Sequence, residues 1–416
     1  MFVAIGNTPR DYAWGSHTAI AGLLGTEPSG GPEAELWLGA HPGSPARILG
    51  DAPEQAADLR AWISAAPEQA LGADLAGHGA RLPFLLKVLA ADAPLSLQAH
   101  PDLARARDGF ARENAEGIPV DAFDRNYRDA FHKPELIVAV SDEFDALCGF
   151  RPLAEALAIL DELAAADAAG DDPQPAALDL LRARLAAEDG LREAVEWLLR
   201  DGRGGDTGEV SWLVERVVAL APAAASAPDT RFGAAFRTVG DLAAHYPGDP
   251  GIVISLLLNH VTLRRGEALY LPAGNMHAYL RGLGIELMAE SDNVLRGGLT
   301  PKHIDIGELV DVLDFSPLPV PYLRPDHPGA GVETFRPDVP DFVLHRIEAA
   351  DAPGTPIPLD GPAIAICTGG GATVSGGRGY VTLLRGASVY VTPDEGPLTV
   401  SGDGEVFLAT VGAGYA

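Results

Sequence analysis

The spacing of apolar residues changes twice along the chain and divides it into three segments. Up to about residue 151, short apolar runs are divided by Gly and Pro, which is typical of β-strands joined by turns. Over residues 152–246, leucines and valines recur every three or four positions, a period that predicts amphipathic helices. From Gly251 onward, β-branched runs broken by glycine return and continue to the C-terminus. We therefore predict a mainly β protein with an α-helical insert.

Proline and glycine positions indicate how these segments group into domains. Residues 317–340 are rich in proline, which predicts an extended crossover. We expect a first β-domain in two parts, residues 1–151 and 247–320, interrupted by the insert at 152–246. Residues 321–416 then form a second β-domain, a small sandwich or barrel.

A nine-residue echo indicates that the two β-domains are related. Residues 265–273 read RGEALYLPA and residues 385–393 read RGASVYVTP, so both place Tyr between aliphatic residues after an Arg-Gly pair. Only the first copy continues into a histidine, His277. We therefore predict that the second β-domain carries no metal site.

Composition and charge exclude several classes of protein. Among 416 residues, 58 are Asp or Glu and 30 are Lys or Arg, a formal net charge of −28. This acidic excess argues against a nucleic-acid partner and against docking on anionic membranes. The longest largely aliphatic run, residues 252–258, is far shorter than the roughly 20 residues of a membrane span, and no signal peptide is visible. The two cysteines, Cys148 and Cys367, fit a reducing compartment. We expect a cytoplasmic monomer, with a homodimer as the alternative.

Lysine is rare in this chain. Only Lys87, Lys133 and Lys302 are lysines, and every other basic residue is arginine. Lysine is a compact point charge whose pKa can shift, whereas arginine is a planar fork that stays protonated. The three positions are therefore candidates for chemistry, with codon usage as the alternative explanation.

Four residues form a candidate metal site. The run from Gly266 to His277 resembles the second signature of the cupin jelly roll, in which a Pro/Gly turn aims a histidine into the barrel mouth. Gln98 and His100 lie two apart on a predicted strand and share a face, although such a pair can also be a polar strand end. Glu135 opens the predicted strand 135–140 and supplies a carboxylate. Two imidazoles, a carboxylate and an amide oxygen suit Zn²⁺ with an open position, whereas a third histidine would better suit an iron oxygenase.

Several blocks resemble those of type I mannose-6-phosphate isomerases. They occur in the family's order as DYAWGS (11–16), AELWLGAHP (34–42), LSLQAHPD (95–102), FHKPELIVAV (131–140), YLPAGNMHAYL (270–280) and SDNVLRGGLTPKHID (291–305). The last 100 residues resemble the family only in their general pattern of short β-branched runs separated by glycines. The resemblance implies a cupin jelly-roll catalytic domain with a helical insert and a second, C-terminal jelly-roll-like domain.

The resemblance also implies the ligands and the reaction. One zinc ion per chain would be bound by Gln98, His100, Glu135 and His277. Arg296 corresponds to the family's active-site arginine, and Lys87 and Lys133 fall where the family's motifs place lysines lining the substrate cleft. The implied reaction interconverts mannose 6-phosphate and fructose 6-phosphate.

Isomerisation of an aldose requires a base, because a proton leaves C2 and one returns to C1 through a cis-enediol. We favour Glu286, which shares a strand face with Glu290 in the segment GIELMAES. Lys133 is the rival if burial beside zinc lowers its pKa, and Asp292 is a weaker candidate. Arg296 is expected to stabilise the negative charge that develops on the enediolate.

Other residues are expected to bind the sugar phosphate. Ser96, which shares a face with Gln98, and Lys87 are the first candidates for the phosphate, with Arg296 as an alternative. Trp14 is either an apolar wall for the sugar or a core residue. Glu35 either binds sugar hydroxyls or braces a zinc ligand.

Two other functions remain open. One is a non-catalytic cupin that binds sugar phosphates through a metal anchor, and such a binder has no need of a general base. The other is another metal-dependent cupin enzyme, such as an oxygenase, which would need redox-active iron.

Overall fold

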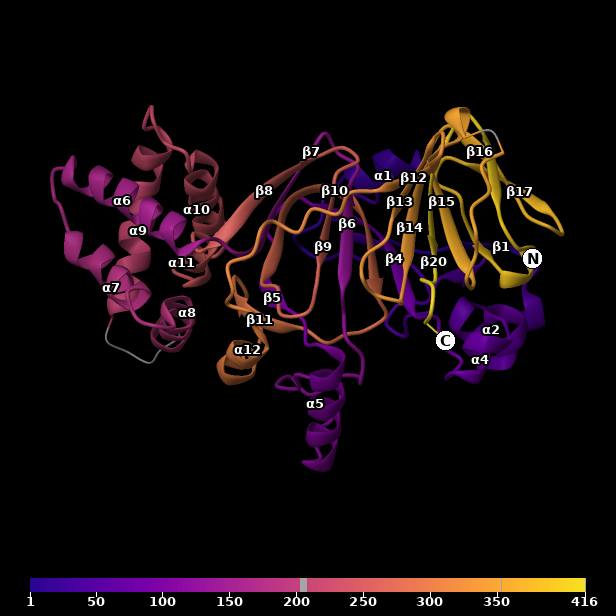
Figure 1. The fold of residues 1–416 in the computed structure, drawn as a ribbon, viewed down its shortest axis with the longest axis horizontal. Coiled ribbons are helices and arrows are strands. Elements are labelled where there is room, and N and C mark those ends of the chain that lie inside the picture. The colour runs from indigo at the N-terminus through magenta and orange to yellow at the C-terminus, as the bar shows by residue number, and fades with distance from the viewer. Residues whose placement is uncertain (203–207, 353, 416) are drawn as a thin grey trace.

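Two systems of antiparallel β-sheet lie side by side, and a group of helices packs against the far end of the first (Figure 1). The computed structural model describes residues 1–202, 208–352 and 354–415. The expected mainly β architecture with a helical segment is confirmed. Within those ranges, every helix is too short or too polar to cross a membrane.

The first system is a nine-stranded sheet that carries the predicted metal ligands. Its strands are β2 (Glu35–Leu38), β4 (Phe84–Ala91), β5 (Leu97–Ala99), β6 (Glu135–Ala139), β7 (Glu143–Phe150), β8 (Leu258–Arg264), β9 (Ala268–Leu271), β10 (His277–Ala289) and β11 (Leu295–Gly298). The long strand β10 pairs with β5 and β7 near its start and with β4 and β6 near its end. The change of partner falls at Gly282, whose φ of 132° and close approach to the Phe144 backbone exclude a side chain. One strand thereby spans both walls of the barrel.

The second system combines an eight-stranded and a three-stranded sheet. The larger sheet has the order β12 (Asp326–Gly329), β13 (Val332–Phe335), β14 (Val343–Glu348), β20 (Glu405–Thr410), β15 (Ala363–Gly369), β18 (Ser388–Val391), β1 (Phe2–Gly6) and β3 (Arg47–Ile48). The smaller sheet comprises β17 (Tyr380–Leu384), β16 (Gly371–Ser375) and β19 (Thr399–Gly402).

The N-terminal strand β1 belongs to this second system, although we grouped residues 1–151 with the first β-domain. Val3 pairs with Tyr390 of β18, and both Val3 and Ile5 are buried. The strand alternates buried and less buried positions, and such a pattern fixes which face is buried but not which sheet it joins.

The predicted echo has a structural counterpart. The Arg-Gly pairs lie just before β9 and β18, and Gly266 and Gly386 have nearly the same positive φ, 85° and 84°. Positive φ favours glycine, so the same turn precedes an equivalent strand in each system.

Five helices form in the described part of the predicted helical segment, 152–246, and a sixth helix, α11, follows it. They are α6 (Leu153–Ala168), α7 (Pro175–Leu185), α8 (Gly190–Arg200), α9 (Glu209–Ala225), α10 (Gly233–His245) and α11 (Gly251–Ser255). Their apolar faces share one core with Leu97, Leu147 and Phe150 of the first sheet. The strand expected from Gly251 is instead the helix α11. A short apolar run that is buried on all sides has the same sequence pattern whether it forms a strand or a helix.

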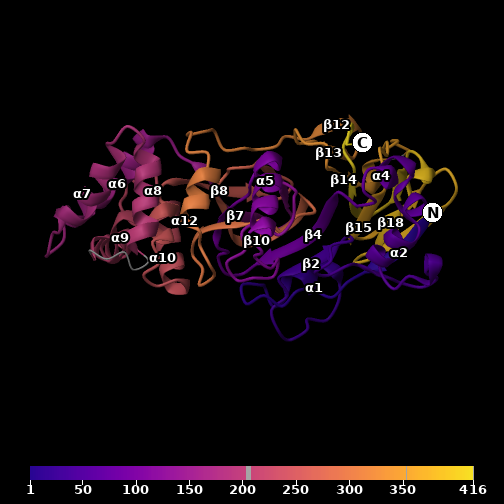
Figure 2. The same ribbon diagram turned by 90° about the horizontal axis from the view of Figure 1, so that it is seen from below.

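The other α-helices described lie outside this group. They are α1 (Ala19–Leu24), α2 (Leu59–Ala65), α3 (Pro67–Leu71), α4 (Ala73–Gly77), α5 (Leu103–Ala115) and α12 (Ile306–Val312), with single 3-10 turns at Pro53–Gln55, Ala349–Asp351 and Pro393–Glu395. Helix α5 projects below the first sheet in Figure 1 and faces the viewer in Figure 2. Helices α1 to α4 were not predicted, because helices of five to seven residues are too short to display a period.

Candidate active site

Three predicted ligands converge at the ends of three strands. His100 follows β5, Glu135 opens β6 and His277 opens β10. Their ligand atoms all lie within 4.8 Å of one another. The Glu135 carboxylate is 3.1 Å from His100 Nε2 through Oε1 and 3.3 Å from His277 Nε2 through Oε2. All three side chains are at most 2% exposed.

Both imidazoles are held so that one nitrogen remains available for a metal. His100 Nδ1 donates to the carbonyl of Asn293 at 2.7 Å, and His277 Nδ1 donates to the carbonyl of Asn275 at 2.9 Å. Each Nε2 is therefore unprotonated in the neutral ring. Burial and the Lys133 charge lower the pKa of His100 to about 4, which keeps that ring neutral.

Three buried ligand atoms without hydrogen-bond partners are suited to binding a metal ion. His100 Nε2, His277 Nε2 and Glu135 Oε2 are buried and have no hydrogen-bond partner among the described residues. Buried polar atoms without partners are costly, and a divalent cation would satisfy all of them at once. Two imidazoles and a carboxylate are an established zinc donor set, so these residues fit Zn²⁺.

The fourth predicted ligand lies next to this group. Gln98 on β5 pairs in register with His277 on one side and with Arg296 on the other. Its side chain lines a cleft of about 480 Å³, which Glu135 also lines. The amide is therefore placed on the cleft side of the metal group.

The same cleft brings the other predicted site residues together. It is lined by the predicted substrate-binding and catalytic residues Trp14, Glu35, Lys87, Ser96, Lys133, Glu286 and Arg296. These seven residues lie at least nine positions apart in the sequence, and β4 and β10 carry Lys87 and Glu286 in direct register.

Lys87 is enclosed by carboxylates. Its Nζ lies 2.8 Å from Glu286 Oε2 and 3.6 Å from Glu35 Oε1. Trp37 Nε1 donates to the other Glu35 oxygen at 2.8 Å and fixes that side chain. Although burial opposes the charge of Lys87, Glu286 and Glu35 raise its pKa. The ammonium thus has two carboxylate partners in the cleft, and its binding of phosphate stays a prediction.

Lys133 lies beside the metal group. Its Nζ is 2.9 Å from Glu135 Oε1. Although burial opposes the charge of Glu135, Lys133 and His100 hold its pKa well below the usual range. The carboxylate is therefore ionised, as a metal ligand must be.

Three cations near the cleft lack carboxylate partners. Arg296 and Lys302 line the cleft, and Arg128 lines the neighbouring pocket. The guanidinium groups of Arg128 and Arg296 and the ammonium of Lys302 make no hydrogen bond or ion pair within the part of the chain that is described. Burial and Arg128 lower the pKa of Arg296, and burial, Arg296 and Arg128 lower that of Lys302. These cations repel one another and form an electrostatic site for an anion.

Sequence reasoning found only part of this cluster. The scarcity of lysine pointed to Lys302 without giving it a role, and Arg128 lies between the recognised blocks, where one arginine among 27 carries no signal. Proximity of the three residues is a property of the fold.

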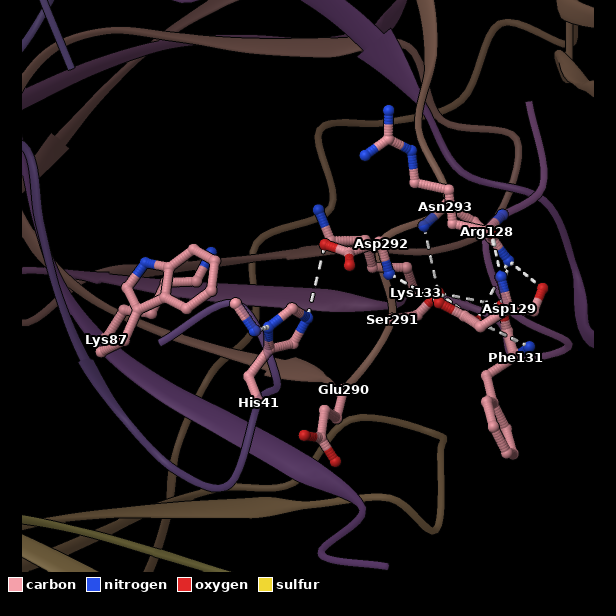
Figure 3. A network of polar contacts seen from close by, with 12 residues as sticks. His41, Lys87, Arg128, Asp129, Phe131, Lys133, Glu290, Ser291, Asp292 and Asn293 are labelled. Carbon is pink, nitrogen blue, oxygen red and sulfur yellow. Dashed lines mark hydrogen bonds and ion pairs between the residues drawn. The ribbon is translucent and has the colours of Figure 1, made fainter. Parts of the chain in front are cut away.

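Asp292, the weaker base candidate, also lines the cleft. Its Oδ1 lies 3.3 Å from His41 Nε2, and Figure 3 shows the two side chains facing each other. Although burial opposes its charge, His41 and Lys133 lower the pKa of Asp292. A lowered pKa makes this carboxylate a weaker base.

Comparisons with known proteins agree with this site. Residues 2–153 match the family model of the phosphomannose isomerase type I catalytic domain. Mannose-6-phosphate isomerase from Escherichia coli (strain K12) is 40% identical over 403 residues, which are 96% of this chain and 97% of that protein. A crystal structure of a phosphomannose isomerase variant from Salmonella typhimurium has 35% identity and a TM-score of 0.85 over 99% of both chains. A zinc-bound mannose 6-phosphate isomerase structure has 35% identity and a TM-score of 0.84 over the same shares. The expected cupin-type fold class is thereby confirmed, and the chain belongs to the type I mannose-6-phosphate isomerase family.

Proposed function

We infer that this protein is a zinc-dependent aldose–ketose isomerase that interconverts mannose 6-phosphate and fructose 6-phosphate through a cis-enediol. The observation that carries this conclusion is the group formed by His100, Glu135 and His277, whose free ligand atoms lie beside a cleft that holds acids and unpaired cations. The match extends over 97% of the relative from Escherichia coli, which is named for this activity.

One zinc ion per chain is held by Gln98, His100, Glu135 and His277. When bound, zinc supplies Lewis-acid chemistry, because it polarises the carbonyl and positions the sugar oxygens. Lys133 keeps Glu135 ionised, and the carbonyls of Asn275 and Asn293 keep the two rings in the ligating tautomer.

Glu286 is the general base that moves the proton between C2 and C1. It lies on β10, the strand that opens with His277, and it lines the cleft. The rival Lys133 is 2.9 Å from the Glu135 carboxylate and would have to give up its proton beside that charge before it could accept another. A carboxylate already in an ion pair with Lys87 needs no such step.

The three cations Arg128, Arg296 and Lys302 are assigned to different parts of the substrate. Arg296 lies opposite Gln98 across β5 and β11, near the metal ligands, and stabilises the enediolate. Lys302 and Arg128 are more exposed and bind the phosphate, with the Ser96 hydroxyl as a further donor. Trp14 forms an apolar wall, and Glu35 holds Lys87.

Replacing Lys302 with methionine tests the phosphate assignment. We expect KM for mannose 6-phosphate to rise about 10-fold or more, the effect of losing one charge-assisted hydrogen bond, while kcat changes much less. Steady-state kinetics measures the split. Arg264→Met removes an exposed cation on β8 at an ion pair with Glu143 and should leave KM unchanged. An unchanged KM in the Lys302 variant would contradict the assignment.

Exchange of solvent deuterium into the sugar tests the reaction itself. With zinc present, the protein should convert mannose 6-phosphate and introduce deuterium at C1 or C2, as NMR can detect. A metal-anchored binder would bind the sugar phosphate without exchange or conversion. An oxygenase would be inert with zinc and active with iron.

We propose that the protein acts as a monomer in the cytoplasm. Its two cysteines, Cys148 and Cys367, are both free and buried, which suits a reducing compartment. Its partner is the small-molecule sugar phosphate, and the net charge of −28 disfavours nucleic acid and anionic membranes.

A further inference from the structure

Asn293 lies between the metal group and an irregular segment, residues 128–131, which lines a pocket next to the cleft. Its side chain is 0% exposed. Its backbone carbonyl accepts the hydrogen bond from His100 Nδ1 at 2.7 Å, so the residue contacts a metal ligand directly. Figure 3 shows it beside Arg128, Asp129 and Phe131.

The side-chain amide of Asn293 forms hydrogen bonds with the backbone of this segment, from Arg128 at its start to Phe131 at its end. Its Oδ1 accepts the backbone N–H of Arg128 at 2.7 Å and that of Asp129 at 3.3 Å. Its Nδ2 donates to the carbonyls of Asp129 and Phe131 at 2.9 and 2.8 Å. The amide thus uses both of its N–H donors and both acceptor positions of its oxygen. It satisfies backbone groups of residues 128–131 that a neighbouring strand would otherwise satisfy.

A second set of contacts holds the two segments together. Ser291 Oγ donates to Asp129 Oδ1 at 2.8 Å, and the backbone N–H of Asp292 donates to Asp129 Oδ2 at 2.8 Å. Ser291 Oγ also accepts the backbone N–H of Asn293 at 3.2 Å. Residues 291–293 and 128–131 are therefore joined by side chains on both sides, as Figure 3 shows.

These contacts reach both ends of the site. Residues 128–131 begin with Arg128, of the cationic cluster, and lead directly into Lys133 and Glu135. The same Asn293 that holds this segment also sets the ring orientation of His100. A single buried residue thus contacts one metal ligand, His100, and holds the segment that begins at Arg128 and ends four residues before Glu135.

We propose that Asn293 is a positioning residue that sets the affinity of the protein for zinc. Its carbonyl orients His100, and its amide fixes the approach of the chain to Glu135. The proposal rests on the proposed zinc-dependent function. Outer partners of metal ligands typically change metal affinity about 10- to 100-fold when they are replaced.

The test replaces Asn293 with aspartate, which keeps the shape and loses both donors. Zinc affinity is measured by competition with a chelator, kcat and KM by steady-state kinetics, and the free energy of unfolding by denaturant titration. We expect zinc affinity to fall about 10-fold or more. Tyr390→Phe is the control, because it removes a buried hydrogen bond to the Ala70 carbonyl in the second sheet system and should leave zinc affinity unchanged.

Ser291→Ala is a milder second variant that removes the hydroxyl contacts to Asp129. We expect a smaller loss of zinc affinity in the same direction, so it carries the test if Asn293→Asp does not fold. Wild-type zinc affinity in the folded Asn293 variant, or in the Ser291 variant should it alone fold, would overturn the proposal. An equal loss in Tyr390→Phe would also overturn it. Absence of zinc binding in the unmodified protein would instead refute the proposed function.

Discussion

Replacing His277 with alanine will remove zinc binding and turnover together. The imidazole supplies one of three ligand atoms that converge within 4.8 Å, and its Nε2 has no other described partner. Loss of a ligand from a small donor set weakens the site by far more than replacement of an outer partner. We expect zinc content below stoichiometry and activity at background, measured by elemental analysis and by kinetics on the same sample.

His345→Ala is the matched control for this variant. His345 is also a buried histidine, 3% exposed, and its Nδ1 lies 2.9 Å from Thr334 Oγ1 in the second sheet system. We expect it to lower the free energy of unfolding while the protein keeps one zinc per chain. Full zinc content in the His277 variant would show that this residue is not a ligand.

Replacing Glu286 with glutamine will lower kcat by about 100-fold or more, while zinc and substrate still bind. The substitution removes the group that accepts the proton, and loss of a general base has this order of effect. Lys87 keeps Glu35 as a carboxylate partner, so the cleft should hold its shape. Steady-state kinetics, zinc analysis and the free energy of unfolding measure the three quantities.

The Glu290→Gln variant is the control that distinguishes a catalytic base from a carboxylate that is only buried. Glu290 directly follows β10, the strand of Glu286; it is 9% exposed and pairs with Arg81 at 3.4 Å, but it does not line the cleft. Burial raises its pKa to about 7, so its protonation alone could be mistaken for that of a catalytic group. Its replacement should leave kcat near that of the unmodified protein. Normal turnover in Glu286→Gln would move the base to Lys133.

The ligand group could be predicted from sequence because each ligand occupies a position that local rules define. Gln98 and His100 share a strand face, Glu135 opens a strand after a proline, and His277 follows a Pro/Gly turn. The resemblance to known blocks then placed the four together. The period of the helical segment was equally readable, because helices of 11 to 17 residues repeat their apolar face several times.

The partners of charged groups could not be predicted in the same way. Lys87 meets Glu286 only because β4 and β10 pair in one particular register. The cluster of Arg128, Arg296 and Lys302 is assembled from strand β11 and two loops, and the place of β1 depends on a strand nearly 400 residues away. Such contacts are set by tertiary pairing, which no local pattern encodes.

Anomalous diffraction at the zinc absorption edge, from crystals of the purified protein, tests the central claim most directly. We predict one peak per chain, about 2.0 to 2.2 Å from His100 Nε2, His277 Nε2 and a Glu135 oxygen, with the Gln98 amide oxygen as the fourth protein ligand. A zinc ion held by other residues, or no peak at this position in active protein, would contradict it.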